Sequence, residues 1–216
     1  GLVVLAGAAG VGLVGGGSAA GPLAMGITVF GEVPPGQSLL RSGARPGDEL
    51  WASGTLCDAR LALEVFRCQA SLDAAAFEAV RVRMERPTPR QALGIALRGI
   101  ASSAIDLSDG LLGDLRHVLQ RSTVGATVQA DALPVSAVLA LQPAALRRLC
   151  TLAGGDDYEL LFTAAPAQAA AVQAAAASAG VAVSRIGVIM AEPGCRVVDA
   201  QGKAVDAILS GFDHFV

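Results

Sequence analysis

The chain has 216 residues, of which 53% are hydrophobic and 16% charged, and it carries a net charge of −3. This length is enough for one large or two small domains with a sizeable core. The negative charge and the low aromatic content argue against a nucleic-acid binder. Four widely spaced cysteines and two histidines, with no CxxC pair, argue against a zinc site and indicate reduced thiols in a cytoplasmic protein.

The first thirty residues contain no charged side chain, but they are not expected to be a signal peptide or to enter a membrane. Glycine is frequent there, no basic residue flanks the apolar run, and Pro22 interrupts it. Residues 2–9 favour the end of a helix, residues 11–14 a short strand, and residues 23–33 a longer strand rich in apolar and β-branched side chains. The chain begins with Gly1 and not with methionine, so we expect a piece of a longer polypeptide.

A break at Pro34-Pro35-Gly36 predicts a domain boundary, with one domain over residues 1–35 and a second over residues 36–216. In the second domain, apolar runs with strand character alternate with segments of helical periodicity. This mixture predicts an α/β (α+β) fold in which a mixed sheet is layered with helices. The expected strands cover residues 49–53, 103–107, 123–130, 158–163, 181–188 and 195–199, and the expected helices cover residues 59–70, 73–85, 91–101, 111–119, 136–141, 143–150 and 166–179.

Carboxylates are concentrated where the strand at residues 103–107 is expected to lead into the next helix. Asp106, Asp109 and Asp114 lie around this turn, and a helix N-terminus offers free N–H groups and the positive end of a dipole. These carboxylates can cap the helix, or they can hold a hard cation that bridges to phosphate oxygens. Capping requires only one of Ser108 and Asp109, and it leaves Asp106 unexplained at the end of an apolar strand.

Three further segments are candidates for ligand binding. Residues 154–160 read Gly-Gly-Asp-Asp-Tyr-Glu-Leu, which allows a close backbone approach to a ligand but also a plain turn with solvated acids. The glycines of residues 15–18 can cradle phosphates or form a flexible turn. Four loop arginines suit phosphate oxygens but are equally compatible with a solvated surface: Arg41, Arg45, Arg86 and Arg90.

Familiar catalytic motifs are absent from the sequence. It contains no Walker-type phosphate-binding loop, no kinase-type HRD or DFG, and no GxSxG nucleophile elbow. His117 and His214 lie in segments that look structural or peripheral, so we do not expect a catalytic histidine. The chemistry is therefore expected to depend on carboxylates and arginines.

Together, these segments resemble the thiamine-monophosphate kinase family. The resemblance implies a fold shared with the aminoimidazole ribonucleotide synthetase and selenophosphate synthetase superfamily. In that fold an N-terminal α/β domain dimerises and supplies much of the ATP site, and a C-terminal α/β domain covers it. Residues 1–35 would then be the end of the first domain and residues 36–216 the second. Seven stretches carry the match, in order over nearly the whole chain: residues 15–21, 41–48, 54–58, 86–90, 104–111, 154–160 and 211–215.

The resemblance also implies an activity, which is the Mg²⁺-dependent transfer of the γ-phosphoryl group of ATP to thiamine monophosphate. It further implies a homodimer for the full-length protein. By position, Asp106 and Asp109 would ligate Mg²⁺. ATP would contact Gly16, Arg41 and Ser108, and the thiamine end of the substrate would contact Asp156 and Phe212.

Three departures from the family pattern bear on activity. Gly17 stands where the family usually has Asp, which removes one Mg²⁺ ligand, and Cys57 stands where Gly is usual. The N-terminal acidic motifs of the family are absent from the chain, so we expect this chain alone to have little or no kinase activity. The alternatives are a non-catalytic copy kept as a folded domain, and another ATP-dependent enzyme of the superfamily, against which residues 154–160 argue.

Overall fold

The structure is a computed structural model that describes residues 2–17 and 20–205. The chain divides into two units, Gly1–Gly36 and Gln37–Val216, and each is described by itself. The division falls directly after the Pro34-Pro35-Gly36 break at which the sequence predicts a boundary. The assignment of the first unit to the end of an ATP-binding domain stays a prediction.

The first unit has one helix among its described residues, α1 (Leu2–Ala8), where residues 2–9 predict it. The strands predicted over residues 11–14 and 23–33 are wrong, because neither segment adopts strand structure. A strand requires a neighbour for its backbone hydrogen bonds, and no described segment of this unit provides one. The apolar side chains of the second segment are exposed, Phe30 to 83%. Across residues 2–17 and 20–205, none of the helices combines the length and the hydrophobicity that crossing a bilayer requires.

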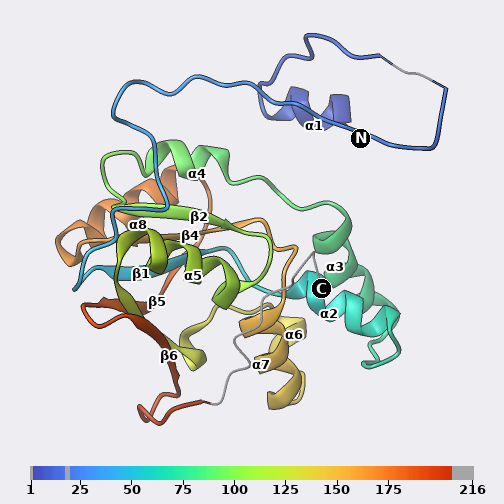
Figure 1. Cartoon of the computed structure of the whole chain (residues 1–216). Helices are drawn as coiled ribbons and strands as arrows, with labels where there is room; N and C mark the ends of the chain where they lie inside the picture. The colour runs from blue at the N-terminus through green and yellow to red at the C-terminus, as the bar shows by residue number, and fades with distance from the viewer. Residues whose placement is uncertain (1, 18–19, 206–216) are drawn as a thin grey trace. The chain divides into compact units, whose positions relative to one another are not determined.

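The second unit is built on a six-stranded sheet in the order β2-β4-β1-β5-β3-β6 (Figure 1). Neighbouring strands pair antiparallel, except that β3 and β6 pair parallel, so the sheet is mixed as predicted. This order leaves β2 at one edge and β6 at the other. The strands are β1 (Glu49–Ser53), β2 (Ser103–Leu107), β3 (Gly125–Gln129), β4 (Glu159–Ala164), β5 (Val183–Met190) and β6 (Gly194–Val198).

Helices pack on both faces of this sheet (Figure 1). Two of them end at least four residues earlier than predicted: the helix expected to reach residue 70 ends at Phe66, and the one expected to reach residue 101 ends at Ala96. After the first, Cys68 has a left-handed backbone (φ 57°) that an α-helix cannot continue. The helices are α2 (Asp58–Phe66), α3 (Ala74–Glu85), α4 (Gln91–Ala96), α5 (Leu111–Ser122), α6 (Ala137–Ala140), α7 (Ala144–Ala153) and α8 (Ala169–Ser178), with 3₁₀ turns at Ala130–Ala132 and Pro166–Gln168.

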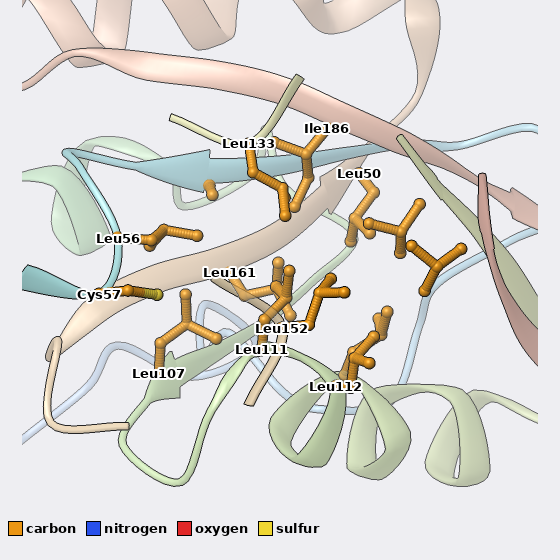
Figure 2. Packing of buried hydrophobic residues seen from close by; sticks show 14 of the residues in the cluster. Leu50, Leu56, Cys57, Leu107, Leu111, Leu112, Leu133, Leu152, Leu161 and Ile186 are labelled. Carbon is orange, nitrogen blue, oxygen red and sulfur yellow. The ribbon is translucent and has the colours of Figure 1, made fainter. Parts of the chain in front are cut away.

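Alternation along the strands divides the core between the two faces of the sheet. Leu161 belongs to the cluster under α2, α5 and α7, whereas its neighbour Phe162 belongs to the cluster under α4 and α8, where it stacks on Trp51 with ring centroids 6.4 Å apart. Figure 2 shows Leu107 and Leu111, which flank the turn between β2 and α5, pointing into the same cluster as Leu161. Burial of these two leucines therefore anchors both ends of that turn.

Glu159, the first residue of β4, is a fully buried carboxylate at which four segments meet. Arg90 donates to it from Nε (2.7 Å) and Nη2 (2.6 Å), Arg83 from Nη2 (2.7 Å), and Ser53 from Oγ (2.5 Å). Burial by itself would raise the pKa of Glu159, but the hydrogen bonds from Arg90 and Ser53 and the arginine charges hold this pKa below its ordinary value. Arg90, one of the loop arginines that suit phosphate, is thus committed to a structural ion pair.

A second buried carboxylate, Asp157, joins the turn before α2 to the loop before β4. It accepts hydrogen bonds from the backbone N–H of Cys57 (2.6 Å) and from the Cys57 thiol (3.4 Å). Burial is the main reason that the pKa of Asp157 is raised to about 7, although the Cys57 hydrogen bonds and the charge of Arg83 oppose the shift. Cys57 itself has a left-handed backbone (φ 78°), a conformation that glycine adopts more easily.

Replacement of Glu159 by Gln is expected to destabilise the second unit by about 2 to 4 kcal/mol, because two arginines lose their buried counter-charge. The pKa of Glu159 is lowered by folding, so its contribution is present at neutral pH and is lost as the pH falls through the folded-state pKa. Urea unfolding followed by the fluorescence of Trp51, the only tryptophan, measures the difference. The control is Glu85→Gln, which removes an exposed pair with Arg81 and should leave the midpoint nearly unchanged. Equal midpoints for the two variants would contradict the assignment.

Replacement of Asp157 by Asn is expected to change how stability depends on pH. Between about pH 4 and pH 7 the folded state binds a proton at Asp157 that the unfolded state has released, so the parent protein loses stability as the pH rises, by up to about 1.4 kcal/mol per pH unit. The Asn side chain cannot ionise. The free energy of unfolding of the variant, relative to that of the parent, should therefore increase as the pH rises across this window, as measured by urea titrations at several pH values. Asp73→Asn, at the exposed N-cap of α3, serves as the control. A difference in the free energy of unfolding between Asp157→Asn and the parent that does not change with pH would refute the raised pKa.

Candidate active site

The turn between β2 and α5 carries three of the predicted site residues, Asp106, Ser108 and Asp109, at the edge of the sheet. Along β2, alternate side chains are buried, and Asp106 falls on an exposed position. Its carboxylate therefore avoids the free-energy cost of burying a charge. Beyond the strand, the backbone N–H groups of Ser108, Asp109 and Gly110 all donate to one oxygen of Asp114, at 3.0, 3.1 and 3.2 Å. The turn therefore wraps around a buried carboxylate in the first turn of α5.

Of the two alternatives that the sequence left open for this turn, an N-cap at Ser108 or Asp109 is wrong. The residue before α5 is Gly110, and no side chain caps the helix there. The Asp114 carboxylate instead accepts the N–H groups of the turn that precedes the helix. Burial is the main reason that the pKa of Asp114 is raised, the charges of Asp109 and Asp106 add to it, and the hydrogen bonds from the backbone of Asp109 and Ser108 oppose it.

The loop before β4 packs directly on this turn. The N–H of Asp156 donates to the carbonyl of Ser108 (2.9 Å) and the N–H of Tyr158 to the carbonyl of Leu107 (2.8 Å). Gly155 permits this approach, since a Cβ there would come within 2.4 Å of the Ser108 carbonyl oxygen. Asp156 (φ 65°) and Tyr158 (φ 52°) both adopt the left-handed conformation that non-glycine residues rarely take. The two sequence motifs are thus held together by backbone contacts.

A pocket of about 570 Å³ opens between this pair of loops and α2. Its size lies within the range of small-molecule sites. Ser108, Asp109, Asp156 and Tyr158 line one side. On the α2 side, Arg60 and Arg67 share the carboxylate of Glu64, at 2.7 and 3.6 Å, which leaves that side with one excess positive charge. The pocket therefore presents carboxylates and guanidinium groups to the same volume.

The negative charge at this site acts on Tyr158. The pKa of its phenol is raised, first by burial and then by Asp156, whose Oδ1 accepts a 3.4 Å hydrogen bond from the hydroxyl. The charges of Asp106 and Asp109 raise the same pKa further. Three of the predicted aspartates therefore act on one side chain, although they come from two distant parts of the sequence.

Arg41 lies beside Asp106 in a shallower depression of about 480 Å³ at the β2 edge. The segment that carries it is fixed to α5 by Ser122, whose hydroxyl donates to the Arg41 carbonyl (3.3 Å) and accepts from the N–H groups of Gly43 and Ala44. Arg121 lines the same depression. Two cations and one carboxylate at this edge suit an anion that is accompanied by a metal ion.

The donor set at the β2–α5 turn fits one kind of magnesium site. No group of three or more carboxylate, histidine or cysteine side chains that could hold a metal occurs within residues 2–17 and 20–205. Asp106 and Asp109 are two carboxylates that act on the same phenol, and Mg²⁺ is commonly held by one or two carboxylates plus substrate phosphates and water. These residues fit an ion that binds together with a nucleotide, not a closed protein cage.

Two of the predicted site residues are not among the described residues of the second unit. Gly16 belongs to the first unit, and Phe212 lies outside the described residues. The sequence interpretation did not single out Tyr158, Arg60 or Arg121 as lining residues. Tyr158 carried a signal, because it follows the two aspartates of the motif at residues 154–160, but the two arginines carried none.

Relatives of this chain are thiamine-monophosphate kinases. The enzyme of Salmonella typhimurium is 42% identical over 94% of this chain and 63% of its own length. The solved structure of thiamine-monophosphate kinase from Stenotrophomonas maltophilia K279a is 44% identical, covers 80% of this chain and 56% of that chain, and superposes with a TM-score of 0.73. The structure of AaThiL complexed with AMPPCP and TMP is 30% identical, covers 82% of this chain and 54% of that chain, and has a TM-score of 0.65.

The match to these relatives extends over nearly the whole chain but not over the whole of each relative. This chain spans 63% of the length of the Salmonella enzyme. The family described as AIR synthase related protein, C-terminal domain, matches residues 45–200, which include the sheet, its helices and both motifs of the pocket. On this evidence the chain belongs to the AIR synthase related protein family, whose C-terminal domain it carries.

Proposed function

We propose that the protein formed by this chain acts as a thiamine-monophosphate kinase. In this reaction an oxygen of the thiamine monophosphate phosphate forms a bond to the γ-phosphorus of ATP. The bond between that phosphorus and the β–γ bridging oxygen breaks, and the products are thiamine diphosphate and ADP. The observation that carries the proposal is the convergence of Ser108, Asp109 and Asp156 on one pocket. The thiamine-monophosphate kinase relatives support it.

The residues of the pocket suit this chemistry. The attacking phosphate is already an anion, with a second pKa near 6, so no strong general base is required, in keeping with a pocket that contains no histidine or lysine among its described lining residues. Phosphoryl transfer depends instead on positioning and on neutralising charge. Arginines and carboxylates that bind a metal provide both.

We assign the roles as follows. ATP contacts are assigned to Gly16, Arg41 and Ser108, and contacts with the thiamine end of the acceptor are assigned to Asp156 and Phe212. Asp106 and Asp109 would hold Mg²⁺, which when bound neutralises the charge on the transferred phosphoryl group. The complex of AaThiL with AMPPCP and TMP supports a site for both substrates on this fold. A homodimer of the complete protein and a cytoplasmic location belong to the same proposal, and the four free cysteines support the second.

The proposal is tested by measuring both turnover and binding. In a full-length version of the protein, Asp106→Asn and Asp109→Asn are expected to lower kcat by about 100-fold or more. In calorimetric titrations they are expected to weaken the Mg²⁺-dependent part of AMPPCP binding. Thiamine diphosphate formation is followed in a coupled assay, with and without a chelator.

The matched control is Glu192→Gln, an exposed carboxylate between β5 and β6 at the opposite side of the sheet. It should behave like the parent in both assays. Full activity after both aspartates are replaced would overturn the metal assignment. A parent protein that binds neither AMPPCP nor thiamine monophosphate would overturn the proposed function.

A further inference from the structure

Tyr158 is an aromatic side chain that folding does not require. It is 42% exposed and belongs to neither of the two hydrophobic clusters, although the next residue, Glu159, is fully buried. Its backbone is left-handed (φ 52°), which costs a non-glycine residue about 1 kcal/mol. Strained residues of this kind persist where the surrounding structure holds them, and they gather at ligand sites.

The surroundings of this ring are negatively charged. The ring lines the 570 Å³ pocket next to Asp109 and Asp156, and its phenol also feels the charge of Asp106. The cationic groups that line the same pocket are Arg60 of α2 and Arg67, the residue after α2, and both share Glu64. An aromatic face beside carboxylates attracts a cation, because the ring quadrupole and the carboxylate charges act in the same direction.

We propose that Tyr158 is a specificity-determining residue that provides the aromatic surface for the cationic thiazolium ring of the acceptor. This inference rests on the proposed function and names how the same pocket recognises its substrate. A thiazolium ring is flat and permanently positive, so it can lie on the Tyr158 ring while Asp156 balances its charge. The acceptor phosphate then extends towards Ser108 and Asp109, on the nucleotide side of the pocket.

The test compares two ligands that differ in this charge. Thiamine monophosphate carries the cation, whereas 3-deazathiamine monophosphate has a carbon in place of the charged ring nitrogen, so it keeps the pyrimidine and the phosphate on a neutral ring. The parent chain should bind thiamine monophosphate more tightly. Tyr158→Leu should weaken thiamine monophosphate binding by about 3- to 30-fold and leave binding of the neutral ligand within about two-fold. Tyr158→Phe should keep the preference of the parent.

Controls separate the inference from folding defects and from the proposed function. Phe66→Leu removes another exposed aromatic ring, 54% exposed at the end of α2, and should not alter the preference. Tyr158→Gln is measured in parallel in case the leucine variant aggregates, and Trp51 fluorescence verifies that each variant is folded. If the parent binds thiamine monophosphate and both non-aromatic variants keep its preference, this inference is wrong and the proposed function stands. If the parent binds neither ligand, both fail.

Discussion

Three backbone N–H groups that converge on one oxygen of Asp114 determine the shape of the candidate site. Because a buried carboxylate takes these donors from the inside, the turn is held in the shape that places Ser108 and Asp109 on the wall of the pocket. The second loop then fits onto the turn through Gly155, where a side chain would collide with the carbonyl of Ser108. The pocket is therefore a consequence of two backbone segments in contact, and its walls are set before any ligand arrives.

Much of the second unit could be predicted from local pattern. The strands at residues 49–53 and 103–107 have the predicted bounds. The first is buried at four of its five positions, and in the second alternating burial leaves a period of two in the sequence. The strand predicted over residues 23–33 has the same pattern but no partner among the described residues. Pairing is a property of distant segments, so a pattern that is correct for a strand does not by itself make one.

The chemical character of the site could be predicted from residue types, whereas the orientation of its side chains could not. Residue type and spacing left Asp109 and Asp156 as candidates, the family resemblance assigned their roles, and the structure places both on one pocket. The role of Asp114 could not be predicted, since an aspartate in the first turn of a helix usually faces water, and its burial depends on how the preceding turn folds back. The same holds for Arg60, whose place on the wall follows from the packing of α2 near Gly154.

The buried carboxylate of Glu159 also restricts which substitutions this sequence can accept during evolution. Its partners come from the end of β1, from α3 and from the linker before α4, and Gly54 leaves no room for a side chain above it. Loss of the acid would leave two guanidinium groups without their buried counter-charge, and loss of an arginine would leave the buried Glu159 carboxylate less fully neutralised. Four positions scattered over more than a hundred residues are thus free to vary only together, and homologous chains should keep or abandon them as one set.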